Sequence, residues 1–183
     1  MDGPTYNDLR QPWNTVAPAS VTLSTTDKAL YGAVTVGNMG NQNWSASKSY
    51  RIEVCGTFTS AATPGNLTVS LYWGTGADAN GTVLAASAAT AWTASQATKT
   101  WKAWFDVTII TIGATGSALA FGAFKCDEAA IAAELMIPAT APAAVTIDTT
   151  TAGNVFSVQA KRSGSTAETM QIAAGYPKVF ANN

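Results

Sequence analysis

Two carboxylates on strongly alternating segments are the first candidates for chemistry. Glu53 and Asp106 each lie on the polar side of a segment in which apolar and polar residues alternate. A glycosidase needs two such carboxylates facing each other across a cleft. The neighbouring Arg51 and Lys102 favour a simpler interpretation, in which opposite charges pair across adjacent strands. We therefore predict no catalytic role for the two carboxylates.

Other catalytic and metal-binding arrangements lack the residue types they need. The 183 residues include no histidine, so neither a Ser-His-Asp nor a Cys-His arrangement can form. Cys55 and Cys126 are too few for a thiolate zinc cluster, and we expect both to be free, buried thiols. Asp78-Ala79-Asn80-Gly81 resembles the start of a calcium loop, but the later oxygen ligands are missing and these residues are typical of turns. We expect no enzyme activity, no cofactor and no metal.

Six tryptophans suggest sugar binding as a second hypothesis. An exposed indole can stack on a sugar ring. Trp44, Trp73 and Trp92 lie at expected strand ends or loops, where a binding face could form. Trp101 is better explained as a core residue and Trp104 as an interface residue.

The chain carries few charges. Charged residues make up 11% of the sequence and the net charge is −1, whereas about 25% is usual for a soluble domain. Nothing in this balance attracts nucleic acid or an anionic membrane. A surface with few charges is poorly protected against self-association, so we expect the protein to work within an assembly. The first residues lack the pattern of a signal peptide and no apolar run has the length of a membrane helix, so we expect a soluble protein made in a cytoplasm.

Alternation with a period of two dominates the middle of the chain. Residues 50–58 and 67–73 each place apolar side chains on one parity, as expected for strands with one buried face. Thr63-Pro64-Gly65-Asn66 between them is typical of a turn, so we predict a hairpin at the centre of the core. A short helix is predicted at 127–136. Further strands are predicted at 29–36, 82–90, 100–112, 117–126, 144–148, 154–161 and 169–176.

The spacing of these strands predicts an all-β domain. Roughly nine strands about ten residues apart, with turn signals between them, are typical of a sandwich or barrel. An antiparallel jelly-roll β-sandwich suits this count and length best. Residues 1–28 contain three prolines and no clear period, so we expect an extended N-terminal arm followed by the jelly-roll domain over 29–183.

Several predicted strands carry a large apolar residue on the side expected to face outward. Tyr72, Trp104, Ile110 and Phe124 occupy such positions. An apolar set on an outer sheet face is typical of a subunit interface, although a strand assigned to the wrong face at a bulge would give the same pattern. We expect a homotrimer, because wedge-shaped jelly rolls can pack around a three-fold axis.

The run SYRIEVCGTFTSAATPGNLTVSLYWGTGADANGTVLAAS resembles a type of virion protein of tailed bacteriophages, especially those of actinobacteria. The tryptophan-containing segment 101–108, the turn at 111–117 and the segment PATAPAAVTIDTTTAGNVFSVQA are also similar to that group. The likeness covers residues 29–176 and leaves the N-terminal arm outside it. Its motifs are turn and strand patterns, and they mark no functional residues.

The resemblance implies a trimeric jelly-roll module on the phage particle. A capsid decoration protein on the outer surface of the head suits the small size, the low charge and the N-terminal arm. Its partner would be the major capsid protein, and Leu9 and Trp13 are the residues that we expect to anchor the arm there. The alternative is a tail-tip or fibre head module that binds host surface glycans, but the sequence has no coiled or repetitive shaft.

Overall fold

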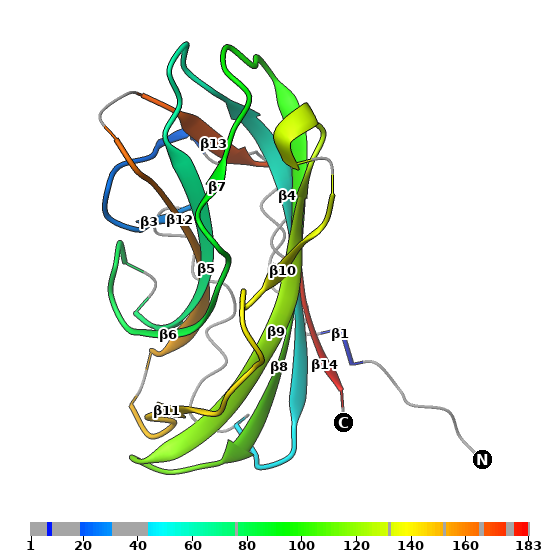
Figure 1. Ribbon diagram of the computed structural model, residues 1–183. Coiled ribbons are helices and arrows are strands. Elements are labelled where there is room, and N and C mark those ends of the chain that lie inside the picture. The colour runs from blue at the N-terminus through cyan, green and yellow to red at the C-terminus, as the bar shows by residue number, and fades with distance from the viewer. Residues whose placement is uncertain are drawn as a thin grey trace, which may run out of the picture.

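The computed structural model describes residues 7–8, 19–30, 44–75, 77–131, 133–151, 153–164, 167–174 and 178–182. These residues form two antiparallel β-sheets packed face to face (Figure 1). The predicted all-β sandwich is therefore confirmed. In place of the helix predicted at 127–136, the chain has a single 3-10 turn, η1, Ala129–Ile131. No helix among the described residues is long and apolar enough to cross a membrane.

The larger sheet contains nine described strands and is built around three long ones. Its strands are β1 Asn7–Asp8, β2 Val21–Thr22, β4 Ser49–Thr59, β8 Lys99–Thr111, β9 Gly116–Cys126, β10 Leu135–Ile137, β11 Val145–Ile147, β13 Thr169–Ile172 and β14 Lys178–Asn182. The hydrogen-bonded order is β1-β14-β4-β8-β9-β10, while β11 also pairs with β9, and β13 pairs with β2 and β4.

The smaller sheet contains five described strands. They are β3 Lys28–Ala29, β5 Asn66–Gly74, β6 Thr82–Ala86, β7 Thr90–Ala91 and β12 Val155–Arg162. Their order is β3-β12-β5-β6, and β7 also pairs with β5.

The predicted central hairpin is wrong, although both of its strands exist. β4 pairs with β8, β13 and β14 in the larger sheet, whereas β5 pairs with β6, β7 and β12 in the smaller one. The connection at 60–65 therefore crosses from one sheet to the other. Gly65 is needed in this crossing, because an added Cβ would lie 1.4 Å from the carbonyl oxygen of Ser163.

Aromatic side chains form much of the core between the sheets. Trp44, Tyr50, Trp73 and Phe156 meet with ring centroids 4.4–5.6 Å apart, mostly edge to face. Such contacts add about 0.5–1.5 kcal/mol each beyond the burial of area. The indole of Trp73 also donates to the carbonyl oxygen of Asp148 at 2.9 Å, so its one polar group is satisfied inside the sandwich.

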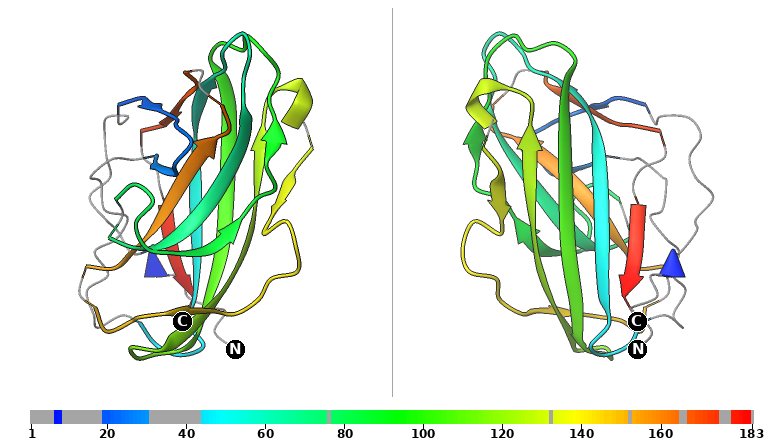
Figure 2. Two further views of the ribbon diagram at one scale, coloured as in Figure 1. Left: turned by 60° about the vertical axis from the view of Figure 1, so that its left-hand side comes forward. Right: turned by 90° about the vertical axis from the view of Figure 1, so that its right-hand side faces the viewer.

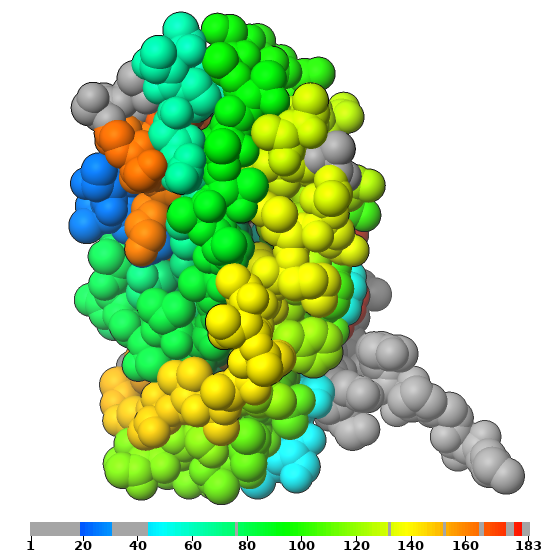
Figure 3. Space-filling model, in the orientation of Figure 1, coloured from blue at the N-terminus to red at the C-terminus, as the bar shows by residue number. Residues whose placement is uncertain are grey.

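Residues 127–147 close one side of the sandwich. β10 and β11 pair with β9 of the larger sheet, and β11 also contacts β6 of the smaller sheet. In the space-filling view this yellow stretch runs down the side of the molecule beside the green strands (Figure 3). The core is thereby covered along this side.

The described part of the predicted arm belongs to the sandwich. Within residues 19–30, β2 pairs with β13 and β3 pairs with β12. Leu23 and Leu30 lie in the core, with 1% and 0% of their surface exposed. The boundary predicted after residue 28 therefore falls inside packed structure. Most of the predicted strand at 29–36 lies outside the described residues.

Candidate functional site

No described strand or helix covers the outer face of the larger sheet across β14, β4, β8 and β9 (right view of Figure 2). Strand register arranges its outward side chains in rows. One row contains Lys178, Glu53, Trp104, Ala123 and Met136. The next row contains Phe180, Arg51, Asp106 and Phe121.

Arg51 is held in a fixed position in the middle of this face. Its Nη1 donates to Asp106 Oδ2 at 2.7 Å, and its Nε donates to Glu53 Oε1 at 3.4 Å. The guanidinium carbon lies 4.1 Å from the ring centroid of Trp104, and the indole of Trp104 donates to Glu134 Oε1 at 3.1 Å. Arg51 thus pairs with both carboxylates that were considered for catalysis. The pair with Asp106 is the predicted cross-strand ion pair, whereas Glu53 lies on the same strand as Arg51. Lys102, the second predicted cation, makes no ion pair with a described carboxylate.

A groove of about 690 Å³ lies beside this cluster. Arg51, Glu53 and Asp106 supply its charged lining. Ser49 and Thr108 share a hydroxyl hydrogen bond of 2.9 Å at its wall. The lining also includes the aromatic rings of Phe121 and Phe180, which lie at the two ends of the row that contains Arg51 and Asp106. A surface that combines aromatic rings with an oriented Arg is typical of protein-binding sites.

Exposed large apolar side chains gather on the same sheet. Ile110, Ile112, Phe121 and Met136 lie on its strands or directly after one, with 43%, 55%, 41% and 60% of their surface exposed. The fifth such side chain among the described residues, Val83, lies on β6 of the smaller sheet and is 40% exposed. Apolar surface gathered in this way is typical of protein-interaction sites.

The outer face of the smaller sheet is, by contrast, covered by the chain itself. The amide of Ala79 donates to Gln159 Oε1 at 2.8 Å, so the loop after β5 lies against β12. Asp78 in this loop accepts from Lys28 Nζ and from the amide of Ala29, both at 2.8 Å. These bonds lower the pKa of Asp78, although burial opposes the shift. The loop compared with a calcium site therefore fastens residues 28–29 to the sheet.

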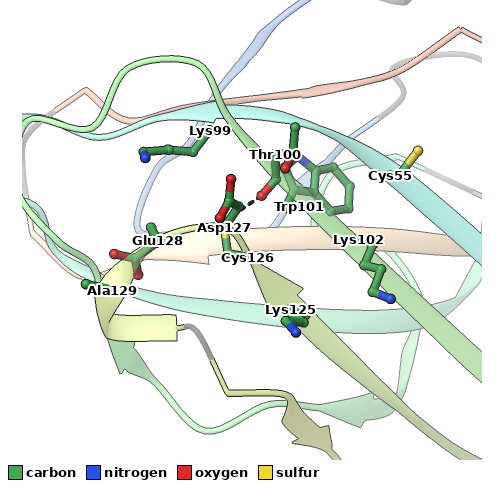
Figure 4. A pocket seen from close by; sticks show the side chains of 10 residues that line it. All are labelled: Cys55, Lys99, Thr100, Trp101, Lys102, Lys125, Cys126, Asp127, Glu128 and Ala129. Atoms are coloured by element: carbon green, nitrogen blue, oxygen red, sulfur yellow. Dashed lines mark hydrogen bonds between the residues drawn. The ribbon is translucent and has the colours of Figure 1, made fainter.

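A second depression, of about 740 Å³, lies where β8 and β9 reach residues 127–129 (Figure 4). Glu128 is fixed beside it, since its Oε2 accepts from the amides of Thr93 and Ala130 at 3.1 Å. The charged and thiol groups of the lining are Lys99, Lys102, Lys125, Asp127, Glu128, Cys55 and Cys126. No three His, Cys, Asp or Glu side chains of the described ranges are grouped so as to hold a metal ion.

The two cysteines are free but differ in burial. Cys126 faces the core, and its Sγ donates to the carbonyl oxygen of Thr100 at 3.2 Å. Burial, reinforced by the charge of Glu128, raises the pKa of Cys126 to about 12. Cys55 lies on the outer side of β4 and is only partly buried. The prediction of a free, buried thiol is thus confirmed for Cys126, whereas for Cys55 only its free state is.

The predicted outward position of Phe124 is wrong. Phe124 is 1% exposed in the core, where its ring stacks on Trp101 at 6.0 Å. The core side of β9 carries small residues apart from Phe124. At Gly122 the neighbouring strand β8 leaves no room for a side chain, because an added Cβ would lie 2.0 Å from the carbonyl oxygen of Trp104. Phe121 therefore takes the outward position.

The other three predicted interface residues have different surroundings. Tyr72 does lie on the outer side of β5, but it is only 6% exposed and donates to Asp27 Oδ2 at 3.0 Å. The chain itself thus covers the surface that Tyr72 was expected to offer to a neighbour. Trp104 and Ile110 lie on the outer face of the larger sheet, half-buried and exposed respectively. Phe121 and Met136 are the members of this face that the sequence did not predict.

The residues predicted to anchor the arm, Leu9 and Trp13, lie outside the described residues. Of this region the structure describes Asn7–Asp8, which pairs with β14 at the edge of the larger sheet. The role of Leu9 and Trp13 stays a prediction.

The tryptophans expected to stack on sugars are buried. Trp44, Trp73 and Trp92 are 7%, 3% and 5% exposed. Trp44 and Trp73 contact each other at 4.4 Å, and Trp92 packs on Phe58 at 4.5 Å. The sugar-stacking prediction is wrong for these three side chains. The core position predicted for Trp101 is confirmed.

Comparisons with known proteins identify no relative: no family model, curated protein or solved structure matches this chain. The function must therefore be argued from the residues and their arrangement.

Proposed function

We propose that this chain is a structural protein of a tailed bacteriophage, a capsid decoration protein that binds the outer surface of the head and stabilises it. The observation that carries the proposal is the outer face of the larger sheet, where Arg51 is held beside Trp104 and Phe121. Apolar and aromatic side chains around an oriented Arg suit contact between subunits of an assembly. The likeness of residues 29–176 to phage virion proteins supplies the further partner, the major capsid protein, which the arm is expected to bind through Leu9 and Trp13.

The buried polar clusters have a structural role. Arg162 lies 2.8 Å from Glu168, and Asp27 accepts from Tyr72 and lies 3.0 Å from Lys161 Nζ. In each cluster the charged groups bind one another and hold strands together. A general acid or base would instead have to reach a substrate proton.

The finer fold within this proposal is a jelly roll. The connections from β4 to β5, β7 to β8, β11 to β12 and β12 to β13 all run between sheets, whereas β8 and β9 form a hairpin within one sheet. Repeated crossing between two antiparallel sheets is what a jelly roll requires. Many copies on one shell bind together, so each contact can be weak.

The alternative, a tail-tip module that binds host glycans, was favoured by loop tryptophans and by polar Gly, Asn and Thr loops. The tryptophans do not support it, because Trp44, Trp73 and Trp92 lie in the core. We therefore keep decoration of the head as the single proposed function.

The test is an add-back experiment on heads assembled without this protein. The purified full chain should sediment with the heads, saturate in a fixed ratio to the major capsid protein and raise the temperature at which the heads break. A variant with Leu9→Ala and Trp13→Ala should bind more weakly, since these residues are expected to anchor the arm. Failure of the wild-type chain to bind such heads, or binding to isolated tails only, would contradict the proposal.

A further inference from the structure

The exposed apolar side chains of the larger sheet form a stripe across β8, β9 and β10. Strand register places Met136 in the same row as Trp104, and Phe121 in the next row. The rings of Phe121 and Trp104 meet edge to face with centroids 6.0 Å apart. Ile110 extends the stripe at the end of β8, where it is 43% exposed. Such a stripe gains free energy when another apolar surface covers it.

Charges of both signs lie beside this stripe. The carboxylates of Glu53 and Asp106 keep 41% and 31% of their side-chain surface exposed around Arg51. One cluster thus offers negative and positive groups together. A partner with a single sign of charge would be repelled either by Arg51 or by the two carboxylates, whereas a second copy of the same face can place opposite charges against each other.

Two lysines on this face are left facing each other. Lys102 on β8 and Lys125 on β9 are direct cross-strand neighbours, and both are exposed. Neither makes an ion pair with a carboxylate in the described part of the chain. Like charges directly opposite each other destabilise a sheet. Carboxylates brought by a second copy would relieve this repulsion.

We propose that two copies of this chain pack together through the outer faces of their larger sheets, around a two-fold axis. A cyclic trimer, which the sequence led us to expect, needs two different complementary surfaces on every copy. Among the described residues, Val83 is the one exposed large apolar side chain away from this sheet. One exposed apolar surface per copy instead fits a two-fold interface, in which both copies contribute the same patch.

A matched pair of variants tests the proposal on the purified full chain. Phe121 and Val83 are 41% and 40% exposed, on different sheets, so Phe121→Glu and Val83→Glu add the same charge at equally exposed positions. Light scattering and sedimentation velocity over a wide concentration range should give a dimer for the wild type. Phe121→Glu should raise the dimer Kd at least about 30-fold, as expected for an aromatic at the centre of an interface, and Val83→Glu should leave it unchanged.

Met136→Glu provides a second variant, since its side chain is 60% exposed and the change does not touch the core. Circular dichroism and the melting temperature of each monomeric variant confirm that it is folded. A wild type that stays monomeric, a wild-type trimer, a dimer that survives both Phe121→Glu and Met136→Glu, or a dimer equally weakened by Val83→Glu would overturn the proposal. The measurement uses no phage heads, so it stands apart from the test of capsid binding.

Discussion

Buried charge in this chain is held by defined partners, and Glu168 is the clearest case. Its side chain is fully buried, and its Oε1 accepts from the amide of Gly65 at 3.0 Å. Arg162 Nε lies 2.8 Å from Glu168 Oε2 and donates to the carbonyl oxygen of Leu23 at 3.0 Å. One ion pair thus connects the crossing between the sheets, strand β12 and the segment before β3.

Replacing Glu168 with Gln should destabilise the fold by about 3 kcal/mol, because the substitution leaves the Arg162 charge buried without its partner. Urea denaturation at neutral pH measures the change in the free energy of unfolding. Glu53→Gln is the control, since the 41% exposed Glu53 side chain contributes at most about 1 kcal/mol. Equal decreases in the free energy of unfolding for the two variants would contradict a larger contribution from the buried ion pair.

Three acidic groups make the fold sensitive to alkaline pH. Burial raises the pKa of Tyr50 from 10.0, that of Tyr72 from 10.0 and that of Cys126 from 9.0, each to about 12. Above its ordinary pKa each group loses its proton in the unfolded chain but keeps it in the folded one. The folded state then binds more protons, so stability is complete below about pH 9 and falls as the pH rises toward 12.

Denaturation experiments at a series of pH values should show this loss, and Cys126→Ala should make the slope between about pH 9 and 12 shallower by removing one of the three groups. A free energy of unfolding that stays constant or rises over this interval would contradict the assignment of these groups to the core.

Among the elements, the long strands could be predicted because their alternation is strong. The parity predicted for 100–112 is that of β8, with Trp101 and Phe105 in the core and Asp106 outside. Which strands pair with each other could not be predicted in the same way. β4 and β5 both turn an apolar side toward one core from opposite sheets, and that pattern is the same as in a hairpin. Period and turn residues therefore located the strands but not the crossing at 60–65.

The short strands and the complete outer face of the larger sheet could not be predicted from the sequence, for a related reason. β10 and β14 span three and five residues, too few for a period to stand out. On β9 Phe124 was assigned to the wrong face by its parity, because small residues such as Gly122 fill most of the core side and give no clear apolar period. The outward positions predicted for Trp104 and Ile110 are those of the structure. The position of Phe121 on the same face follows from the register of β9 against β8, which the sequence does not show.

β4 and β13 lie very close together at Gly56. A Cβ added to Gly56 would lie 1.7 Å from the carbonyl oxygen of Gln171, which is backbone and cannot move aside. Gly56→Ala should therefore cost at least about 1–3 kcal/mol, as other overpacked positions do. Thermal unfolding of Gly56→Ala beside Cys55→Ala, a neighbour on the outer side of the strand, measures this cost. Melting temperatures that agree would mean that the two strands are not as close as described.

In the molecule as a whole, the outer faces of the two sheets differ in how much of their side chains is exposed. On the smaller sheet Ser157 and Gln159 point outward, yet both are fully buried under segments of the same chain. On the larger sheet Phe121 and Met136 remain exposed. Described segments of the chain thus cover one face and leave the other exposed. β1 lies at the edge of the exposed face, so an arm that binds a shell would start beside the face that binds a second copy.

The central claim, that this chain decorates a phage head, is tested most directly by its copy number in purified particles. Quantitative mass spectrometry gives the number of copies relative to the major capsid protein. We predict hundreds of copies per particle, in a simple ratio to the shell protein, because a decoration protein repeats with the lattice to which it binds. A few copies to a few dozen would place the chain elsewhere on the particle, and its absence from particles would contradict the account.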